Sequence, residues 1–365
     1  MTVIPKSLIE TIRNATIRAR GRSIAKRHKK IMTRPAAAWT ARAKIGNDIG
    51  TALSLVLATK GCSYARGEQG GCTMCSYLLD GTERQPSHEE LISQFQGAME
   101  KLSDESKPLS VKIYTSGSFL DTDEVPQETR DEILGIISND DRIVEVVIES
   151  RPEFILDEVM VQTRAILGER QIEIGMGLES SNDVVRDICV NKGFTLAEFK
   201  KAVEIAKQHQ IGTRAYILLK PPFLTEKNAL DDSITTIEDA VKLGVTTISI
   251  NPVNIQKFTM VEDLWRNGLY RSPWLWTVVE VLRESYKNVG GSVFILCDPV
   301  AAGKRRGTHN CGVCDKQIVN AIRDFSLNQD ASVLESLDCS CKASWKHTLT
   351  HEDVSLLVHN DRKLW

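Results

Sequence analysis

The chain has 365 residues and carries 46 lysines and arginines against 48 aspartates and glutamates, a formal net charge of −2. Its hydrophobic fraction of 42% and charged fraction of 26% are typical of a soluble globular protein, and no apolar stretch approaches the ~18 residues of a membrane span. The first ten residues lack the apolar core of a signal peptide. Nine cysteines, several in close pairs, favour metal binding in a reducing compartment over disulfides, so we expect a cytoplasmic protein with no membrane contact.

A strongly basic segment opens the chain. Within residues 1–45 the only acid is Glu10, against twelve lysines and arginines: Lys6, Arg13, Arg18, Arg20, Arg22, Lys26, Arg27, Lys29, Lys30, Arg34, Arg42 and Lys44. The segment carries about +11 and the remainder about −13, so we predict a basic N-terminal arm over residues 1–48 that contacts nucleic-acid phosphates. A solvated basic helix is the alternative, and we expect Trp39 to anchor the arm rather than to stack on a base.

From residue 49 to 300 the chain alternates short β-rich runs with amphipathic stretches. The predicted strands are residues 54–60, 110–115, 143–150, 171–178, 213–219 and 246–251. The predicted helices are residues 88–102, 127–138, 156–167, 196–209, 231–243 and 275–288. Six such units predict an α/β fold in which helices cover a parallel sheet, as a partial barrel or a doubly wound sheet. In a barrel, the active site forms at the C-terminal ends of the strands, where residues 116–118, 149–151, 179–181, 220–222 and 251–252 lie.

A cysteine-rich loop follows the first predicted strand. Cys62, Cys72 and Cys75 are separated by nine and two residues within a glycine-rich stretch. Three thiolates can hold three irons of a four-iron cluster and leave the fourth iron open, whereas ordinary ferredoxin clusters use four cysteines. A zinc site is the alternative, but it needs a fourth ligand. The nearest later candidate, His88, begins a predicted helix.

Two further cysteine pairs lie beyond residue 300, within a predicted Cys-rich C-terminal module of residues 301–365. A helix predicted over residues 316–325 separates the pairs, which are Cys311 with Cys314 and Cys339 with Cys341. This pattern suits a closed tetrahedral zinc site, which we favour, and a second iron–sulfur cluster is the alternative. The remaining cysteines, Cys189 and Cys297, fit as small core residues.

The motifs of the predicted barrel resemble those of the radical S-adenosylmethionine (SAM) enzymes. The nine-residue gap between the first two cysteines is similar to that in the branch containing the catalytic subunit of Elongator. Residues 149–155 (ESRPEFI), 177–180 (GLES) and 191–195 (NKGFT) also resemble segments of that branch. The resemblance implies a partial (βα)6 radical SAM barrel in which the three loop cysteines ligate a four-iron, four-sulfur (4Fe–4S) cluster that binds and cleaves SAM.

The same resemblance implies a set of cofactor contacts. Ser116 and Gly117 occupy the glycine-rich position after the second strand, and Glu149 the acidic strand end that contacts the cofactor. Lys192 falls where related enzymes place an arginine for the cofactor carboxylate, although lysine cannot form the bidentate fork. Met74 stands in place of the usual aromatic residue before the third cysteine, and Tyr77 is the candidate to replace it near adenine.

The C-terminal cysteine signature, together with Trp345, resembles the archaeal radical SAM enzymes that form archaeosine. This resemblance covers nearly the whole chain and implies a tRNA-modifying C–N lyase that acts with archaeosine synthase, its lysine-transferring partner subunit, and with an electron donor. Its substrate would be the 7-deazaguanine base in the tRNA D-loop, already carrying a lysine. The alternatives are an Elongator-like or methylthiolating enzyme acting on another tRNA nucleotide, and a non-catalytic nucleic-acid-binding iron–sulfur protein.

Overall fold

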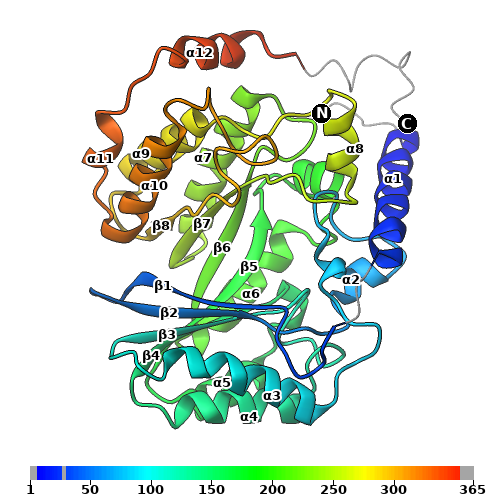
Figure 1. Cartoon of the computed structure of the whole chain (residues 1–365), viewed down its shortest axis with the longest axis vertical. Helices are drawn as coiled ribbons and strands as arrows, with labels where there is room; N and C mark the ends of the chain where they lie inside the picture. Colours follow the sequence, from blue (N-terminus) through cyan, green and yellow to red (C-terminus); the bar gives the residue numbers. More distant parts are fainter. Residues whose placement is uncertain (1–5, 27–29, 354–365) are drawn as a thin grey trace.

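The computed structural model describes residues 6–26 and 30–353, built around one eight-stranded sheet (Figure 1). The strands are β1 (Ala37–Ile45), β2 (Asp48–Val56), β3 (Leu109–Tyr114), β4 (Ile143–Glu149), β5 (Gln171–Glu179), β6 (Gly212–Leu219), β7 (Thr247–Pro252) and β8 (Phe294–Leu296). They follow one another in chain order, with β1 antiparallel to β2 and every later pair parallel. Strands β2 to β7 confirm the predicted parallel sheet, whereas the sequence missed β1 and β8.

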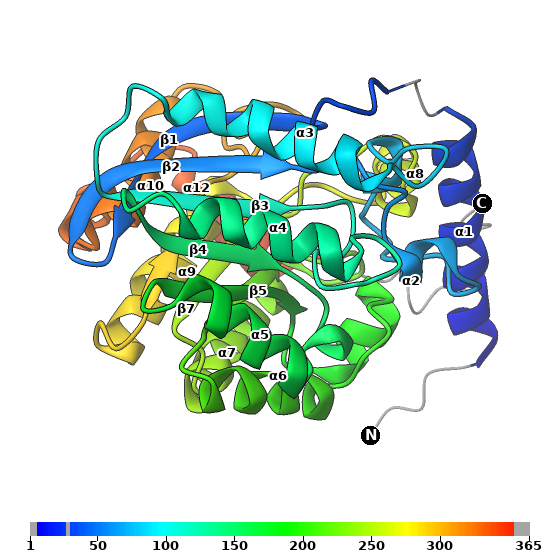
Figure 2. The same cartoon turned by 90° about the horizontal axis from the view of Figure 1, so that it is seen from below.

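Helices cover the outer face of this curled sheet. The α-helices are α1 (Lys6–Ala25), α2 (Ser63–Arg66), α3 (His88–Met99), α4 (Gln127–Ser138), α5 (Asp157–Leu167), α6 (Leu196–Gln208), α7 (Glu226–Lys242), α8 (Met260–Arg266), α9 (Leu275–Val289), α10 (Asp315–Asn328), α11 (Ser332–Glu335) and α12 (Lys342–His351). The shorter turns are η1 (Tyr77–Leu79), η2 (Glu100–Leu102), η3 (Pro152–Phe154) and the π-helical η4 (Val185–Val190). Figures 1 and 2 show α3, α4 and α5 side by side against β2 to β4. In the parts of the chain described here, no helix combines the length and apolar character needed to cross a bilayer.

The alternation of side chains along each strand decides what faces the inside of the half-barrel. In β4, Val146 and Ile148 belong to the main hydrophobic core, which includes residues of the covering helices. Because successive side chains point to opposite faces, Glu145 and Glu149 face the inner side. Parallel strands buried on both faces are normally apolar throughout, so carboxylates on the inner face mark it as a place where polar ligands bind.

Helix α1 is docked on the body of the protein. Its Ile12 and Ala15 are each 2% exposed and pack with Val253 and Met260 in a second hydrophobic cluster. Both views place α1 beside α2 and α8. Strand β1 also falls within the predicted arm, so the described part of residues 1–48 contains a docked helix and an edge strand. Residues 1–5 and 27–29, which include Arg27 and Lys29 of the predicted arm, lie outside the described residues.

The C-terminal segment shares the core of the barrel. Ile322 and Phe325 of α10 and Trp345 of α12 belong to the same hydrophobic cluster as the barrel strands. Phe325 packs edge-on against Tyr286 of α9, with ring centroids 5.4 Å apart. The described part of the predicted module, residues 301–353, is therefore continuous with the barrel in its packing, and residues 354–365 lie outside the described part.

Candidate active site

The three loop cysteines converge at the C-terminal end of β2. Cys62 precedes α2, and Cys72 and Cys75 lie between α2 and η1. Burial raises the pKa of all three thiols, and the thiolate charge of Cys72 raises the pKa of the other two further. The positive charges of Lys192 and Arg151 lower the pKa of Cys72 against this effect. Neighbouring cations favour the thiolate, which is the form that binds iron.

The spacing of these thiols fits a cluster better than a single ion. Within residues 6–26 and 30–353, the only set of three or more possible ligand atoms lying within 4.8 Å of one another is that of the C-terminal cysteines. Thiolates around one zinc ion lie ~3.8 Å apart, given Zn–S bonds of about 2.3 Å. The three loop thiols do not form so compact a group, and a four-iron cluster, which places each thiolate on a different iron, does not need one.

The segment that follows β5 holds the cysteine loop through hydrogen bonds. Asn191 has a left-handed backbone with a φ of 55°, and its side-chain amide donates to the carbonyls of Gln69 (2.8 Å) and Gly71 (2.7 Å). The backbone amide of Thr73 donates to the carbonyl of Val190 at 2.9 Å. These bonds join the loop to η4 and to Asn191, the first residue of the NKGFT segment.

Helix α1 holds the same loop from the other side. The Arg20 guanidinium donates to the carbonyls of Ala65 and Gly67, the latter at 2.6 Å. A Cβ at Gly70 would lie 2.7 Å from the side chain of Ile17, so the loop and the helix touch. Arg20, one of the cations of the predicted arm, therefore helps to position the cysteine loop, and its contact with nucleic acid stays a prediction.

Gly117 packs directly on the cysteine loop. A Cβ at this position would lie 2.5 Å from the Cα of Cys62 and 2.3 Å from the carboxylate of Glu124. Glu124 is fully buried and accepts from the backbone amide of Ser118 (2.7 Å) and the hydroxyl of Thr59 (2.5 Å). Only glycine permits so close an approach of the two backbones. The sequence predicted Gly117 as a cofactor contact and gave no sign of Glu124.

Replacing Gly117 with alanine is expected to prevent assembly of the cluster. The added Cβ overlaps backbone atoms of Cys62, and a backbone cannot rotate away as a flexible side chain can. The visible absorbance of the anaerobically reconstituted protein measures the effect. Gly135→Ala is the matched control, because its added Cβ meets nothing within 4 Å. Full wild-type absorbance in Gly117→Ala would show that the loop tolerates the overlap and that the packing argument is wrong.

Charged side chains at neighbouring strand ends complete the surroundings of the loop. Burial raises the pKa of Glu149 to about 8, with Glu179 and Glu124 acting in the same direction and Lys192 against it. The ammonium group of Lys192 lies 2.6 Å from Glu179. Lys192, which we predicted to pair with a cofactor carboxylate, therefore has a protein partner. The hydroxyl of Ser116 is buried without a hydrogen-bond partner and is free to bind a ligand.

Tyr77 lies in η1, directly after the third cysteine. Its side chain is half exposed, and burial of the hydroxyl, then the charges of Cys75 and Glu149, raise its pKa. Tyr77 thus lies beside the loop cysteines in the chain, and its role near adenine stays a prediction.

Two other residues of the predicted rim have structural partners. Arg151 pairs with Glu153 at 2.5 Å rather than with the site carboxylates. Lys220 is almost fully buried and pairs with Glu226 (2.7 Å) and Glu352 (2.9 Å). The Lys220 network fixes the end of β6 to the C-terminal segment, so it does not contribute a free charge to the site.

The four C-terminal cysteines form a compact group of thiols. Their sulfur atoms are 3.8 Å apart for Cys311 and Cys314, 3.8 Å for Cys311 and Cys339, and 3.7 Å for Cys314 and Cys341. All four lie within 4.8 Å of one another. The indole of Trp276 donates to the sulfur of Cys341 at 3.3 Å. The structure thus brings together the four residues that the sequence predicted as one metal site.

Comparison with known proteins identifies the family. The chain is 41% identical over 321 residues to archaeosine synthase subunit beta of Methanosarcina acetivorans, covering 88% of this chain and 91% of that protein. The chain belongs to the archaeosine synthase subunit beta family. A second member of that name, from Thermococcus kodakarensis, is 39% identical over 85% of this chain and 95% of its own length. An uncharacterized protein of Methanocaldococcus jannaschii is 40% identical over 94% of this chain and 95% of its own.

No protein-family model matches the chain. Among solved structures, an N-terminally truncated Elp3 of Methanocaldococcus infernus aligns with a TM-score of 0.49 at 13% identity, covering 64% of this chain and 59% of that one. The archaeosine synthase relatives confirm the family that the C-terminal cysteine signature predicted. No sequence pattern indicated three roles that hold the site in place. These are the bonds of Asn191 and Arg20 to the cysteine loop and the bonds of Glu124 beside it.

Proposed function

We propose that this chain is a radical SAM enzyme that completes archaeosine in tRNA. Its substrate is the D-loop 7-deazaguanine base that carries a lysine joined through the side-chain nitrogen. The reaction would remove a hydrogen atom from the lysine side chain near that nitrogen. Loss of one electron back to the cluster and addition of water would then cleave the carbon–nitrogen bond, release the rest of the lysine as an aldehyde and leave the amidine of archaeosine. Two observations support this proposal most strongly. Three cysteine thiols lie together at a strand end of a half-barrel, and the chain is 41% identical to an archaeosine synthase subunit beta.

The proposed cofactors are a 4Fe–4S cluster and SAM. Cys62, Cys72 and Cys75 are the cluster ligands that the chain offers, which leaves one iron open for the amino and carboxylate groups of SAM. A reduced cluster with SAM bound would supply a 5′-deoxyadenosyl radical. The unpartnered hydroxyl of Ser116 is available to SAM. Because its pKa is about 8, the Glu149 carboxyl is mostly protonated at neutral pH and can donate a hydrogen bond.

We also propose one zinc ion at the C-terminal cysteines. Three of the sulfur–sulfur distances are 3.7–3.8 Å, which fits the ~3.8 Å edge of a tetrahedron with Zn–S bonds of about 2.3 Å. Backbone amides of Cys314 and Val313 lower the pKa of Cys311, which favours the thiolate needed for metal binding. Four protein ligands leave no open position, so the site is structural.

The proposed partners are tRNA, the lysine-transferring archaeosine synthase and an electron donor. For tRNA, the exposed cations of α1 are the strongest candidates, because α1 lies against the cysteine loop. Lys6, Arg18 and Lys26 are exposed and form no ion pair with any described residue. Arg22, by contrast, pairs with Asp263 at 2.6 Å. A D-loop base must leave the tRNA fold to reach the site, so phosphate contacts beside it help to hold the opened tRNA.

Replacing Lys6, Arg18 and Lys26 together with glutamine is expected to weaken tRNA binding and to flatten its dependence on salt. Each lost phosphate contact should lower the slope of log affinity against log salt by about 0.7–0.9. Filter binding or fluorescence anisotropy over a range of salt concentrations measures both quantities. Arg20 is left unchanged, since it holds the cysteine loop.

The matched control for this triple variant replaces three exposed lysines on other helices, Lys201, Lys207 and Lys287. The control removes the same charge and should bind tRNA with nearly the wild-type slope. Equal slopes for both triple variants would show that the α1 cations do not contact tRNA, and that this face serves another purpose.

The test of the proposed function is an anaerobic reaction with purified components. Reconstituted protein, SAM, a chemical reductant and tRNA bearing the lysine-modified base should yield 5′-deoxyadenosine and archaeosine. Formation of 5′-deoxyadenosine with a mass change at another nucleotide would support the Elongator-like or methylthiolating alternative. tRNA binding without any 5′-deoxyadenosine would support a non-catalytic iron–sulfur protein.

A further inference from the structure

A cavity of about 950 Å³ lies inside the half-barrel at the end opposite the cysteine loop. Its walls come from the N-terminal ends of β4, β5, β6 and β7, and from β1 and β8 at the two edges of the sheet. None of the residues predicted to bind the cluster or SAM lines it. The cavity is therefore a second part of the barrel interior, separate from the cofactor site.

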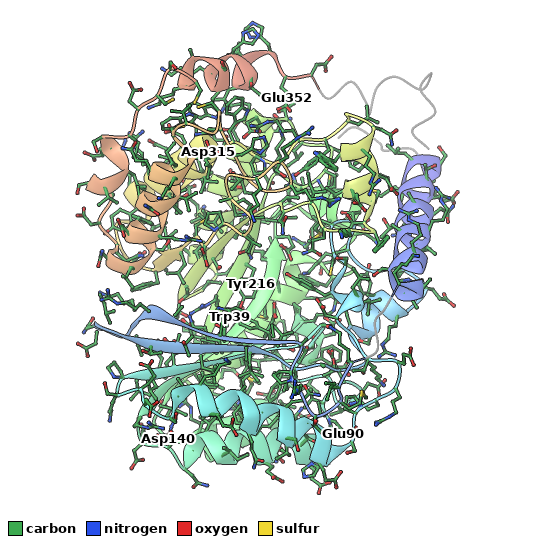
Figure 3. All side chains as sticks on the ribbon, viewed as in Figure 1. Trp39, Glu90, Asp140, Tyr216, Asp315 and Glu352 are labelled. Carbon is green, nitrogen blue, oxygen red and sulfur yellow. The ribbon has the colours of Figure 1, made fainter. Side chains whose placement is uncertain are left out.

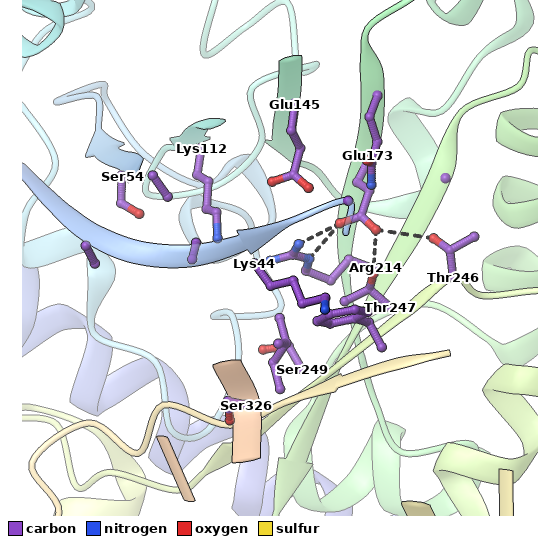
Figure 4. A pocket seen from close by; sticks show the side chains of 18 of the residues that line it. Lys44, Ser54, Lys112, Glu145, Glu173, Arg214, Thr246, Thr247, Ser249 and Ser326 are labelled. Carbon is purple, nitrogen blue, oxygen red and sulfur yellow. Dashed lines mark hydrogen bonds and ion pairs between the residues drawn. The ribbon is translucent and has the colours of Figure 1, made fainter. Parts of the chain in front are cut away.

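Charged side chains of both signs point into this cavity from neighbouring strands (Figure 4). Glu173 of β5 and Arg214 of β6 form a buried pair with nitrogen–oxygen distances of 2.6 and 3.0 Å. Glu145 of β4 accepts from the hydroxyl of Ser110 at 2.6 Å through one oxygen, and its other oxygen has no hydrogen-bond partner among the described residues. Lys112 of β3 points into the same space.

Lys112 is the unusual member of this group. Its ammonium group makes no ion pair or hydrogen bond with any described residue, although it lies in a protein interior. Burial lowers the pKa of Lys112 to about 8, and the positive charge of Arg214 acts in the same direction, whereas Glu145 and Glu173 oppose it. The side chain is only partly buried, and a cation of this kind without a protein partner is well placed to bind an anionic ligand group.

Tyr216 lies on the same face of the sheet as Arg214. It follows Arg214 by two residues on β6, and Figure 3 shows it in the middle of the molecule. Its buried hydroxyl lies next to the side chain of Tyr114, which lines the cavity.

The depth of the barrel suits an extended lysine. Glu145 in the cavity and Glu149 near the cysteine loop are four residues apart on β4, or ~13 Å at ~3.3 Å per residue. A lysine side chain extends ~6 Å from its Cα to its terminal nitrogen, given C–C bonds of about 1.5 Å. The remaining distance leaves room for the adenosyl group of SAM between the cluster and the reacting carbon.

We propose that the cavity binds the free α-amino acid end of the lysine carried by the tRNA base, with Lys112 binding its carboxylate and Glu145 its ammonium group. This inference rests on the proposed function and adds a substrate-selecting subsite to it. A zwitterion matches this part of the cavity because the unpaired ammonium group of Lys112 and a free carboxylate oxygen of Glu145 face it from neighbouring strands. A phosphate group matches less well, since the carboxylates of Glu145 and Glu173 would repel it.

The test compares two tRNA substrates, one carrying lysine on the base and one carrying 1,5-diaminopentane, which lacks the α-carboxylate. Wild-type protein should prefer the lysine substrate by about 10- to 100-fold in kcat/KM, as expected for one charge-assisted hydrogen bond. Lys112→Met should lose that preference. The variant should fold about as stably as the wild type, because it removes a partly buried cation that has no ion-pair partner. Lys242→Met, which replaces an exposed lysine of α7, is the matched control and should keep the preference.

A third substrate carries 6-aminohexanoate, which lacks the α-ammonium group. Glu145→Gln should lose discrimination against it while retaining discrimination against 1,5-diaminopentane. If wild-type protein converts all three substrates equally well, the cavity does not select the amino acid end and the inference fails, with the proposed function intact. An equal loss of activity on every substrate in a folded Lys112→Met variant would likewise overturn it. If wild-type protein converts no substrate, the proposed function itself is wrong.

Discussion

Alanine in place of Cys75 is expected to abolish both cluster binding and SAM cleavage. Cys62, Cys72 and Cys75 are the proposed ligands, and residues 61–75 contain no other cysteine or histidine that could replace one of them. Loss of one cysteine leaves two thiolate ligands, which are too few to hold a cluster with an open iron. Iron analysis, visible absorbance and 5′-deoxyadenosine formation after anaerobic reconstitution measure the loss, which should exceed 100-fold in SAM cleavage.

Cys297→Ala is the matched control for this prediction. Cys297 is 1% exposed in the hydrophobic core and belongs to neither cysteine group, so its replacement should leave the iron content and SAM cleavage near wild type. SAM cleavage by Cys75→Ala at the wild-type rate would show that the cluster is held elsewhere. The assignment of the loop cysteines would then be wrong.

The second large effect is expected at the C-terminal cysteines. Alanine in place of Cys314 should release zinc and lower the melting temperature by more than ~10 °C, because a structural zinc ion contributes free energy of folding directly. Cys314 is 5% exposed, and its sulfur lies 3.8 Å from that of Cys311 and 3.7 Å from that of Cys341. The loss of stability should extend to the barrel, since Trp345 of the next helix shares the barrel's core.

Metal analysis of the reconstituted wild-type protein decides the identity of this site. The account expects one zinc and about four irons per chain. About eight irons and no zinc would show a second cluster instead. A melting temperature of Cys314→Ala equal to that of Cys297→Ala would show that the four thiols bind no structural metal.

Much of the fold was predictable because its signals are local. The helices α3 and α6 begin at capping boxes, with Ser87 and Glu90 in one and Thr195 and Glu198 in the other. The six parallel strands are apolar runs flanked by polar turns. The missed strands lack these signals: β8 has three residues, and the cations of β1 led us to group it with the arm.

The residues of the candidate site could be predicted only where their type and spacing form a short motif in the sequence. The cysteine spacing and the strand-end glycine are of this kind. The bonds of Asn191 to Gln69 and Gly71 join residues about 120 positions apart, and no local pattern reveals them. The ion pair of Lys192 with Glu179 was missed because only the folded chain brings the two side chains together. The isolation of Lys112 can be recognised only when every neighbouring strand is in place.

The central claim is that this chain converts the lysine-bearing 7-deazaguanine base to archaeosine. Mass spectrometry of tRNA nucleosides from cells lacking the protein tests it most directly. The account predicts that archaeosine disappears and that the lysine-bearing nucleoside accumulates, and that the wild-type gene restores archaeosine while the Cys75→Ala gene does not. Normal archaeosine levels in the deletion strain, or loss of another modified nucleoside with archaeosine unchanged, would contradict it.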